Sequence, residues 1–229
     1  MGNNTDFELF YLFDPFCGWC YASAPALAEV ARTDAVSLRM MPSGLFADNN
    51  ARPIDAMAKH AWTNDSRINE LTGQKFTEAY RVNVLLKPNG VFDSGAATRA
   101  ITLIGQIDAQ LEPALLHDLQ IARYVDGRDT ALATEVARVT GKTAKRNGYE
   151  VDVDHVLTRL ESDQELWRGT DERVGRTQRL MDRLELSGVP QLVVASNGRF
   201  QPIRSADLYQ GAEAGRSALV AAKERTERP

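Results

Sequence analysis

The sequence has few of the residues that cross-link a protein, bind metals or anchor it to a membrane. It has 229 residues but only two cysteines and three histidines, which excludes the disulfide scaffold of small secreted domains. The formal net charge of −4 gives no excess of cations for a nucleic-acid backbone. No apolar run approaches the roughly 18 residues of a membrane-spanning helix. We therefore expect neither a nucleic-acid partner nor a membrane partner.

The first residues also lack the pattern of an exported protein. Residues 1–6 contain an acid and no base, and the apolar run 7–13 contains Glu8 and ends at Asp14-Pro15. A secretory signal needs a basic start and a cleavage site of small residues after its apolar stretch. We therefore expect a cytoplasmic protein.

What the chain does have is an ordinary globular composition, with 43% hydrophobic and 25% charged residues. This composition excludes disordered and fibrous classes. At roughly 150 residues per domain, the length suggests one large domain or one domain that carries a large insertion.

The hydrophobic pattern predicts strands only near the two ends. The run 7–13 predicts a buried strand, 19–31 a helix kinked at Pro25, and 36–41 a second strand. A strand–helix–strand order implies that the two strands are parallel. The middle predicts helices, apart from a weak strand fragment at 149–151, with Gly141 among the boundary residues. The predicted helices are 52–62, 66–71, 75–86, 94–107, 113–125, 129–139, 154–160 and 163–186.

The C-terminal part predicts a hairpin followed by a helix. A β-rich run at 190–195 is followed by the turn signal Ser196-Asn197-Gly198 and by a return strand at 199–203. Pro202 favours an edge position for the return strand, because proline cannot donate to the ladder. A helical turn at 206–209, a closing helix at 212–223 and a frayed tail at 224–229 complete the prediction.

The two cysteines are Cys17 and Cys20, a C-x-x-C motif at the junction of the first strand and the first helix. Residues three apart lie on one face of a helix, within reach of a disulfide. The unpaired amides of a first helical turn stabilise a thiolate, which makes Cys17 the better nucleophile. Cys20, one turn further on, is placed to resolve the mixed disulfide that Cys17 forms.

Two other interpretations of the motif are weaker. A zinc site needs four ligands, and only His60, His117 and His155 remain as nitrogen donors, with no paired spacing. We therefore expect no metal, and interpret the histidines as surface or hydrogen-bonded residues. Two structural thiols would be the better interpretation if the motif lay inside a helix or strand.

The run Asp14-Pro15-Phe16-Cys17-Gly18-Trp19-Cys20-Tyr21 and the late Gly188-Val189-Pro190 resemble the DsbA-like thioredoxin family. Within that family, the chain is most similar to the predicted cytoplasmic protein-disulfide isomerases and the FrnE-like oxidoreductases. The resemblance covers essentially the whole chain. It implies an α/β, thioredoxin-like fold with a large all-helical insertion. The thioredoxin-like domain would comprise residues 1–44 and 187–229, and the insertion 45–186 would cap the active site.

The resemblance also implies a function and roles for site residues. The chain would be a thiol–disulfide oxidoreductase or protein disulfide isomerase with Cys17 and Cys20 as its catalytic pair. Although an X-Pro bond taken alone favours trans, the resemblance makes Val189-Pro190 a cis-proline loop that faces the cysteines. The backbone of Val189 would bind an extended substrate, and Pro190 would shape the contact.

The dipeptide between the cysteines, Gly18-Trp19, joins the predicted substrate-binding residues. It differs from the Pro-His of strongly oxidising periplasmic members, so we expect a less oxidising dithiol. The expected partners are protein or peptide thiols and disulfides, with glutathione as a candidate electron partner. No cofactor beyond the Cys17–Cys20 disulfide is expected.

Two rival functions remain open. Kappa-type glutathione transferases and hydroxychromene-carboxylate isomerases share the implied fold, but they use a serine-type activation of glutathione and need no second cysteine. The presence of Cys20 favours the dithiol function over these enzymes. A binding module with an incidental C-x-x-C motif is the second rival.

Other residues have two interpretations each. Asp14 is either a proton acceptor for the Cys20 thiol or a turn former with Pro15, and the turn is favoured. Trp19 either contacts substrate or packs against the insertion, with no preference between the two.

Further candidates are interpreted as structural. Met40, Met41 and Phe46 could line a groove, but core packing is favoured. Asp171-Glu172-Arg173 and the arginine-rich run to Arg183 are interpreted as a solvated helix face.

Overall fold

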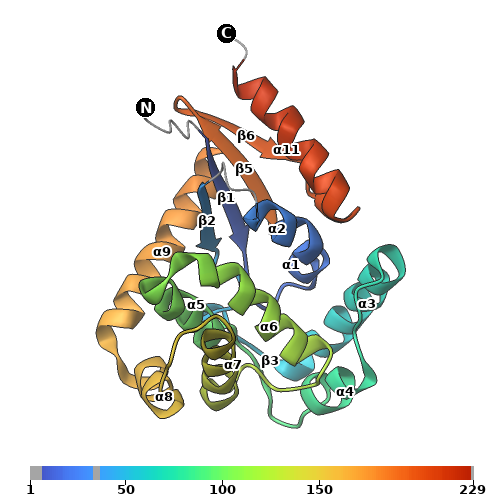
Figure 1. Cartoon of the computed structure of the whole chain (residues 1–229). Coiled ribbons are helices and arrows are strands. Elements are labelled where there is room, and N and C mark those ends of the chain that lie inside the picture. Colours follow the sequence, from blue (N-terminus) through green and yellow to red (C-terminus); the bar gives the residue numbers. More distant parts are fainter. Residues whose placement is uncertain (1–6, 33–36, 228–229) are drawn as a thin grey trace.

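The computed structural model describes residues 7–32 and 37–227, and both ends of the chain contribute to its main sheet. This four-stranded sheet has the order β2-β1-β5-β6 (Figure 1). Its strands are β1 (Glu8–Phe13), β2 (Ser37–Pro42), β5 (Gln191–Ser196) and β6 (Arg199–Ile203). The α/β class predicted from the sequence is confirmed.

The strand pairing follows the predicted topology. β1 pairs in parallel with β2 and antiparallel with β5. β5 turns into β6 through Asn197 and Gly198, whose φ angles of 50° and 74° are those of a tight hairpin turn. The edge position that Pro202 predicts for β6 is also confirmed.

The helix after β1 is interrupted, whereas the sequence predicts one kinked helix. α1 (Gly18–Ala22) ends at Ser23, and α2 (Ala24–Ala31) then begins with Pro25 in its first turn. Proline suits that position because an amide in a first turn has no helical partner. The Ser23 hydroxyl donates to the Cys20 carbonyl at 2.9 Å. The predicted kink is therefore a complete break, and the C-x-x-C helix has only five residues.

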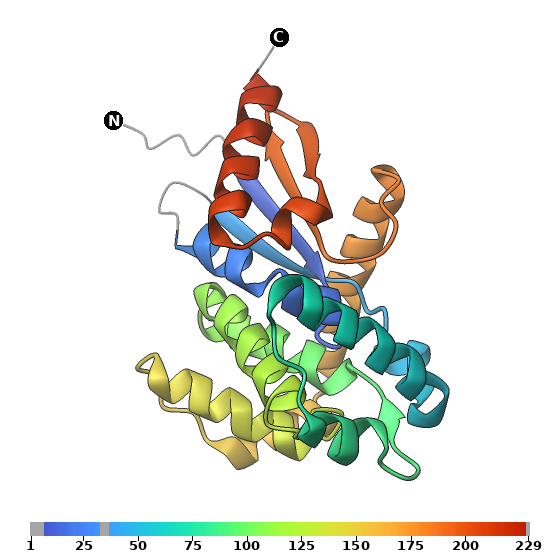
Figure 2. The ribbon, with the colours of Figure 1, turned by 90° about the vertical axis from the view of Figure 1, so that its right-hand side faces the viewer.

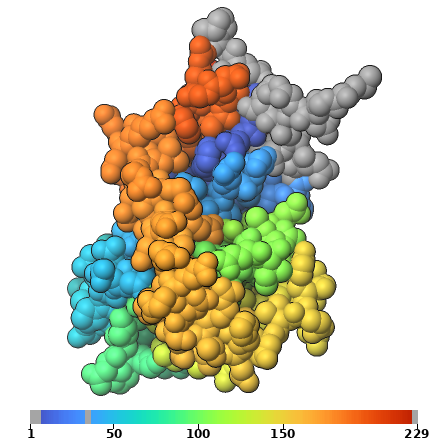
Figure 3. Space-filling view, turned by 90° about the vertical axis from the view of Figure 1, so that its left-hand side faces the viewer, coloured from blue at the N-terminus to red at the C-terminus, as the bar shows by residue number. Residues whose placement is uncertain are grey.

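Helices cover the sheet on both sides. α2 packs against α11 (Ala212–Glu227), so closely that a Cβ added to Gly215 would lie 2.7 Å from the Ala26 Cβ. On the other side, α9 (Gln164–Arg183) packs against β2 and runs from the sheet to the helical part of the chain (Figures 1 and 3).

The middle of the chain is predominantly helical, as predicted, and lies at one end of the sheet (Figure 2). The predicted helix 75–86 is two short helices instead. The helices of this part are α3 (Ile54–Thr72), α4 (Glu78–Tyr80), a π-helix (Arg81–Leu85), α5 (Gly95–Ile107), α6 (Glu112–Tyr124), α7 (Ala133–Arg146) and α8 (Val153–Ser162), with short 3-10 turns at Asp48–Asn50 and Ala109–Leu111. A separation into two domains at residues 44 and 187 stays a prediction.

The start of this helical part differs from the prediction. The predicted helices 52–62 and 66–71 form one continuous α3, because residues 63–65 include no helix breaker and Asp65 is turned inward. Arg52-Pro53, predicted as helical, forms the strand β3 and pairs with β4 (Val91–Phe92).

Gly141 lies inside α7 rather than at its end, and the predicted helix 129–139 is shifted toward the C-terminus. The glycine allows α8 to approach, because a Cβ there would be 2.6 Å from Cγ2 of Val153. The strand fragment predicted at 149–151 is absent from the described structure, and the Tyr149 hydroxyl donates to Asp108 instead.

The last helix is longer than predicted, since α11 continues through Glu227, within the segment that the sequence predicts to fray. Residues 1–6 and Val36 lie outside the described residues. Among the helices that are described, none combines the length and the apolarity that crossing a bilayer requires.

We predict opposite effects for alanine at two helical glycines. Gly141→Ala should lower the free energy of unfolding by about 1–3 kcal/mol, because the methyl group overlaps Val153 in a packed interior. In α9, the position that a Cβ on Gly169 would occupy has no heavy atom within 4 Å, so Gly169→Ala should raise stability by up to about 1 kcal/mol. Urea unfolding of both variants measures this, and two changes of the same sign would contradict it.

Candidate functional site

Cys17 and Cys20 lie at the end of β1, where the chain turns into α1. The Cys17 amide donates to the Asp14 carbonyl at 3.1 Å, which closes the turn, and Cys17 is the N-cap residue of α1. Both thiols are free. Cys17 keeps 8% of its surface exposed and Cys20 only 1%, so Cys17 is the thiol that an external disulfide can reach.

Val189 meets Cys17 although the two residues are 172 positions apart in the chain. The Cys17 thiol donates to the Val189 carbonyl, with 3.4 Å between sulfur and oxygen, and the Val189–Pro190 peptide bond is cis. The loop that the resemblance implies therefore does face the cysteines. Its role in substrate binding stays a prediction.

Cys20 is held as a neutral thiol. Burial raises its pKa well above the ordinary value, and the hydrogen bond with Cys17 and the electrostatic effect of that neighbour raise it further. The Tyr11 hydroxyl, on β1, contacts the Cys20 carbonyl at 3.3 Å and Ser23 Oγ at 2.7 Å. The two cysteines thus differ in exposure, and burial disfavours ionisation of Cys20, the thiol in the resolving position.

Asp14 is a fully buried carboxylate beside this pair. It accepts hydrogen bonds from the Phe16 and Phe46 amides and from the Ser94 hydroxyl, at 2.9, 3.1 and 3.1 Å. Burial is the main cause that raises its pKa to about 6. The Phe16 contact is that of a turn former, whereas acceptance of a proton from Cys20 stays a prediction.

The residues between the cysteines are each packed against a neighbour. Trp19 is half-buried and lies against Tyr209, with 4.8 Å between ring centroids. Tyr209 follows α10 (Ser205–Leu208), so this contact involves the C-terminal part of the chain rather than the helical insertion that we considered as a packing partner. Gly18 faces Asp65 of α3, and a Cβ at Gly18 would overlap Oδ1 of Asp65.

Asp65 belongs to a buried polar cluster that the sequence analysis missed. It accepts a hydrogen bond from the Tyr80 hydroxyl at 3.1 Å, and burial is the main cause that raises its pKa to about 7. Arg123, fully buried, lies with its guanidinium carbon 3.8 Å from the Phe16 ring centroid. The sequence signal for Asp65 was its helical spacing from two buried residues, Ala61 and Ile68.

The remaining sequence candidates are packed in the core or exposed. Met40 is buried and Phe46 packs edge-on against Phe92, so both have the structural role that we favoured. The three histidines are exposed. No group of metal-binding side chains occurs in residues 7–32 and 37–227.

Arg173 corrects the prediction of a fully solvated helix face on α9. Its guanidinium donates to the Met40 carbonyl at 2.8 Å and pairs with Glu112 at 2.6 Å. The face is only partly solvated, because α9 packs against both β2 and α5.

The Asp65 carboxyl should make stability depend on pH. Because its pKa is raised in the folded state, its stabilising effect is complete below about pH 4 and is lost as the pH rises through about 7. Asp65→Asn should therefore flatten the fall in the free energy of unfolding across this range. The fall in the free energy of unfolding should be smaller in the variant than in the unmodified protein by up to about 4 kcal/mol, at about 1.4 kcal/mol for each tenfold change in proton affinity. Urea unfolding at several pH values measures it.

Glu70→Gln is the matched control for this prediction, since Glu70 is exposed on the same helix. This variant should keep the pH dependence of the unmodified protein. Identical pH dependence in the Asp65→Asn variant and the unmodified protein would show that the assignment to Asp65 is wrong.

The chain was compared with known proteins. No family model and no curated protein matches it. Among solved structures, it is similar to the cytosolic disulfide reductase DsbM from Pseudomonas aeruginosa, with 26% identity, coverage of 96% of this chain and 99% of that chain, and a TM-score of 0.79. The structure of DsbM with glutathione gives 27% identity, coverage of 95% and 99%, and a TM-score of 0.77.

Two more distant structures show the fold alone. A protein from Nitrosomonas europaea, described as a candidate protein disulfide isomerase, has 22% identity, coverage of 96% and 98%, and a TM-score of 0.72. A 2-hydroxychromene-2-carboxylate isomerase has 16% identity, coverage of 96% and 95%, and a TM-score of 0.51. The thioredoxin-like fold with a helical insertion is thereby confirmed. The C-x-x-C pair at the start of α1 and the similarity to DsbM support the predicted resemblance to the DsbA-like thioredoxin family.

Proposed function

We propose that this protein reduces or rearranges disulfides of polypeptide substrates through the Cys17–Cys20 dithiol. The observation that carries the proposal is the arrangement of three groups. Cys17 is the more exposed thiol, the Val189 carbonyl lies 3.4 Å from its sulfur, and protonated Cys20 lies behind it. The similarity to DsbM, described as a disulfide reductase, supports this direction of reaction.

In the first step, the Cys17 thiolate attacks one sulfur of a substrate disulfide. The substrate S–S bond breaks, one substrate sulfur leaves as a thiolate and takes a proton, and the other stays bonded to Cys17. The buried Cys20 thiol then loses its proton and attacks the Cys17 sulfur. The substrate leaves as a dithiol, having gained two electrons and two protons, and Cys17 and Cys20 are left as a disulfide.

Asp14 is the proposed acceptor of the Cys20 proton. Its carboxyl is fully buried, and a pKa of about 6 leaves it mostly ionised at neutral pH yet able to accept a proton. The three donors that bind Asp14 hold it in place beside the motif. Cys20 interacts electrostatically with this carboxylate, which is a further support for the assignment.

The proposed substrate site uses Val189, Pro190, Gly18 and Trp19. The peptide group of Val189 can pair with an extended chain, in the manner of strand addition. Trp19, half-buried against Tyr209, leaves part of its surface exposed to a substrate. These contacts would hold a substrate cysteine next to the Cys17 sulfur.

We propose an external thiol, such as glutathione, as the reductant that restores the dithiol, with no additional cofactor. The DsbM structure that contains glutathione supports this choice. Because DsbM is described as cytosolic, we also propose the cytoplasm as the site of action, where the glutathione pool is reducing.

Cys20→Ser should accumulate mixed disulfides between Cys17 and its substrates in cells, because the resolving step is lost. Non-reducing gels and mass spectrometry of the full-length variant measure this. The double variant Cys17→Ser, Cys20→Ser is the control and should trap nothing.

Absence of adducts in the Cys20→Ser variant, together with glutathione conjugation of small electrophiles by the unmodified protein, would favour the transferase or isomerase alternative. Equal amounts of adduct in the Cys20→Ser variant and the double variant would also contradict the proposed role of Cys17.

The residue at position 19 should set how strongly oxidising the Cys17–Cys20 disulfide is. An imidazolium there stabilises the Cys17 thiolate and so the reduced form. Trp19→His should therefore shift the equilibrium with glutathione toward the dithiol by roughly tenfold, about 30 mV. Trp19→Phe, which keeps an aromatic ring against Tyr209, should leave the equilibrium near that of the unmodified protein. Equal shifts in both variants would contradict the electrostatic explanation.

A further inference from the structure

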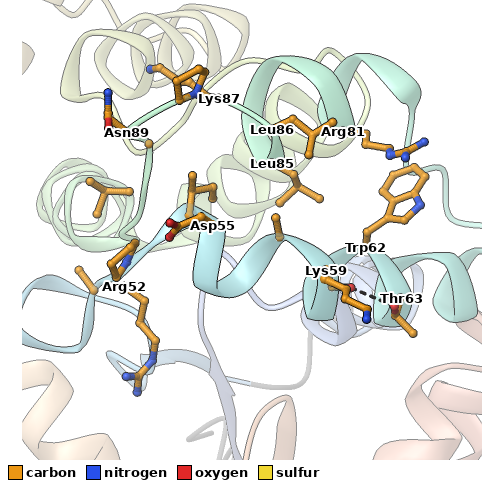
Figure 4. A pocket seen from close by; sticks show the side chains of 17 residues that line it. Arg52, Asp55, Lys59, Trp62, Thr63, Arg81, Leu85, Leu86, Lys87 and Asn89 are labelled. Carbon is orange, nitrogen blue, oxygen red and sulfur yellow. Dashed lines mark hydrogen bonds between the residues drawn. The ribbon is translucent and has the colours of Figure 1, made fainter.

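A groove of about 1020 Å³ lies between α3 and the segment 81–91 (Figure 4). We call it the basic groove. Trp62 of α3 faces Leu85 and Leu86 across it, and Ile54 also lines the groove. Leu86 and Val91 are 57% and 47% exposed, which is unusual for large apolar side chains that gather in one place.

Cations surround this apolar surface. Arg52, Lys59, Arg81 and Lys87 line the groove, against the single acid Asp55. This local excess of positive charge contrasts with the net charge of −4 of the whole chain. The groove is therefore suited to a ligand that combines apolar groups with negative charge.

Two of these cations, Arg52 and Lys59, are available to a ligand, whereas Lys87 and Arg81 already have partners. Lys87 pairs with Asp129 at 2.7 Å, and Arg81 lies 5.3 Å from the Trp62 ring centroid and near Glu78. Arg52 and Lys59 are exposed, and neither has an ion-pair partner among the residues that the structure describes. An anionic group bound there would not have to displace an existing partner.

The groove shares a lining residue with a cavity at the proposed substrate site. This second cavity, of about 290 Å³, is lined by Gly188, Val189 and Arg52, among others. Arg52 lines the basic groove as well, and its side chain extends away from the Leu85–Leu86 side (Figure 4). A polypeptide held at the Val189 backbone can thus run through the smaller cavity, past Arg52 and into the groove.

We propose that the basic groove binds an acidic, apolar segment of the polypeptide substrate, next to the cysteine that reacts with Cys17. This inference rests on the proposed function, of which it specifies the substrate class. A polypeptide is favoured over a small molecule because the two cavities, which share Arg52, together are lined by residues from Val189 to Leu86. Acidic side chains would pair with Arg52 and Lys59, and apolar ones would cover Trp62 and Leu86.

The test measures binding without thiol chemistry. Two fluorescein-labelled peptides of equal length carry serine in place of cysteine. One has aspartate and leucine residues beside the serine, and the other has lysine and leucine residues. Fluorescence anisotropy with the full-length protein gives the two dissociation constants. We expect the acidic peptide to bind roughly five- to tenfold more tightly, a preference that falls with added salt.

Two variants with matched controls assign this preference to the groove. Lys59→Glu should abolish or reverse it, while Lys142→Glu, the same charge change at an exposed lysine of α7, should keep it. Leu86→Ser should weaken binding of both peptides. Leu71→Ser, at a 62% exposed leucine of α3 outside the groove, should not.

The groove assignment is overturned if both peptides bind equally, or if each variant behaves like its control. Reduction of 2-hydroxyethyl disulfide by the unmodified protein is measured in parallel, because this small uncharged disulfide tests the dithiol without the groove. Loss of that activity with selective binding intact would count against the proposed function and support the groove. Reduction of 2-hydroxyethyl disulfide without selective binding of the acidic peptide would support the proposed function and count against the groove.

Discussion

The hydrogen bond between the Cys17 thiol and the Val189 carbonyl joins two distant parts of the chain, and the strand order makes it possible. β1 and β5 are antiparallel neighbours, with Leu12 opposite Gln191. The end of β1 therefore lies beside the start of β5, and the residues that follow one strand meet those that precede the other. Sheet topology thus brings the dithiol and the proposed substrate-binding backbone together.

Residues of the helical insertion fix the C-x-x-C motif through contacts with two buried carboxyl groups, whose burial is unfavourable when they are ionised. Asp14 accepts hydrogen bonds from Phe46 and Ser94, and Asp65 of α3 lies against Gly18. Both carboxyls are buried, and their raised pKa values mean that ionisation at neutral pH reduces stability. The same α3 forms one wall of the basic groove, so one helix both supports the C-x-x-C helix and contributes to the proposed substrate surface.

Most of the fold could be predicted from the sequence, because periodicity and turn residues are local signals. The strand–helix–strand start, the Asn197-Gly198 hairpin and the helical middle were all predicted. The continuous α3 was not predicted. Neither was Gly141 inside α7 or the partly buried Arg173–Glu112 pair, since these two depend on neighbours distant in sequence. At the site, the C-x-x-C motif identified the thiols. The helical spacing of Asp65 from Ala61 and Ile68 indicated an inward position. No local pattern indicated its partners Tyr80 and Arg123, which come from two other helical segments.

The central claim is that Cys17 and Cys20 act together as one exchange unit. Its most direct test is the mass of the reduced, full-length protein after reaction with glutathione disulfide. The account predicts a product lighter by two hydrogen atoms, with Cys17 and Cys20 cross-linked, and the release of two glutathione molecules for each protein. A stable glutathione adduct on Cys17 with Cys20 still free, or two unreacted thiols, would contradict it.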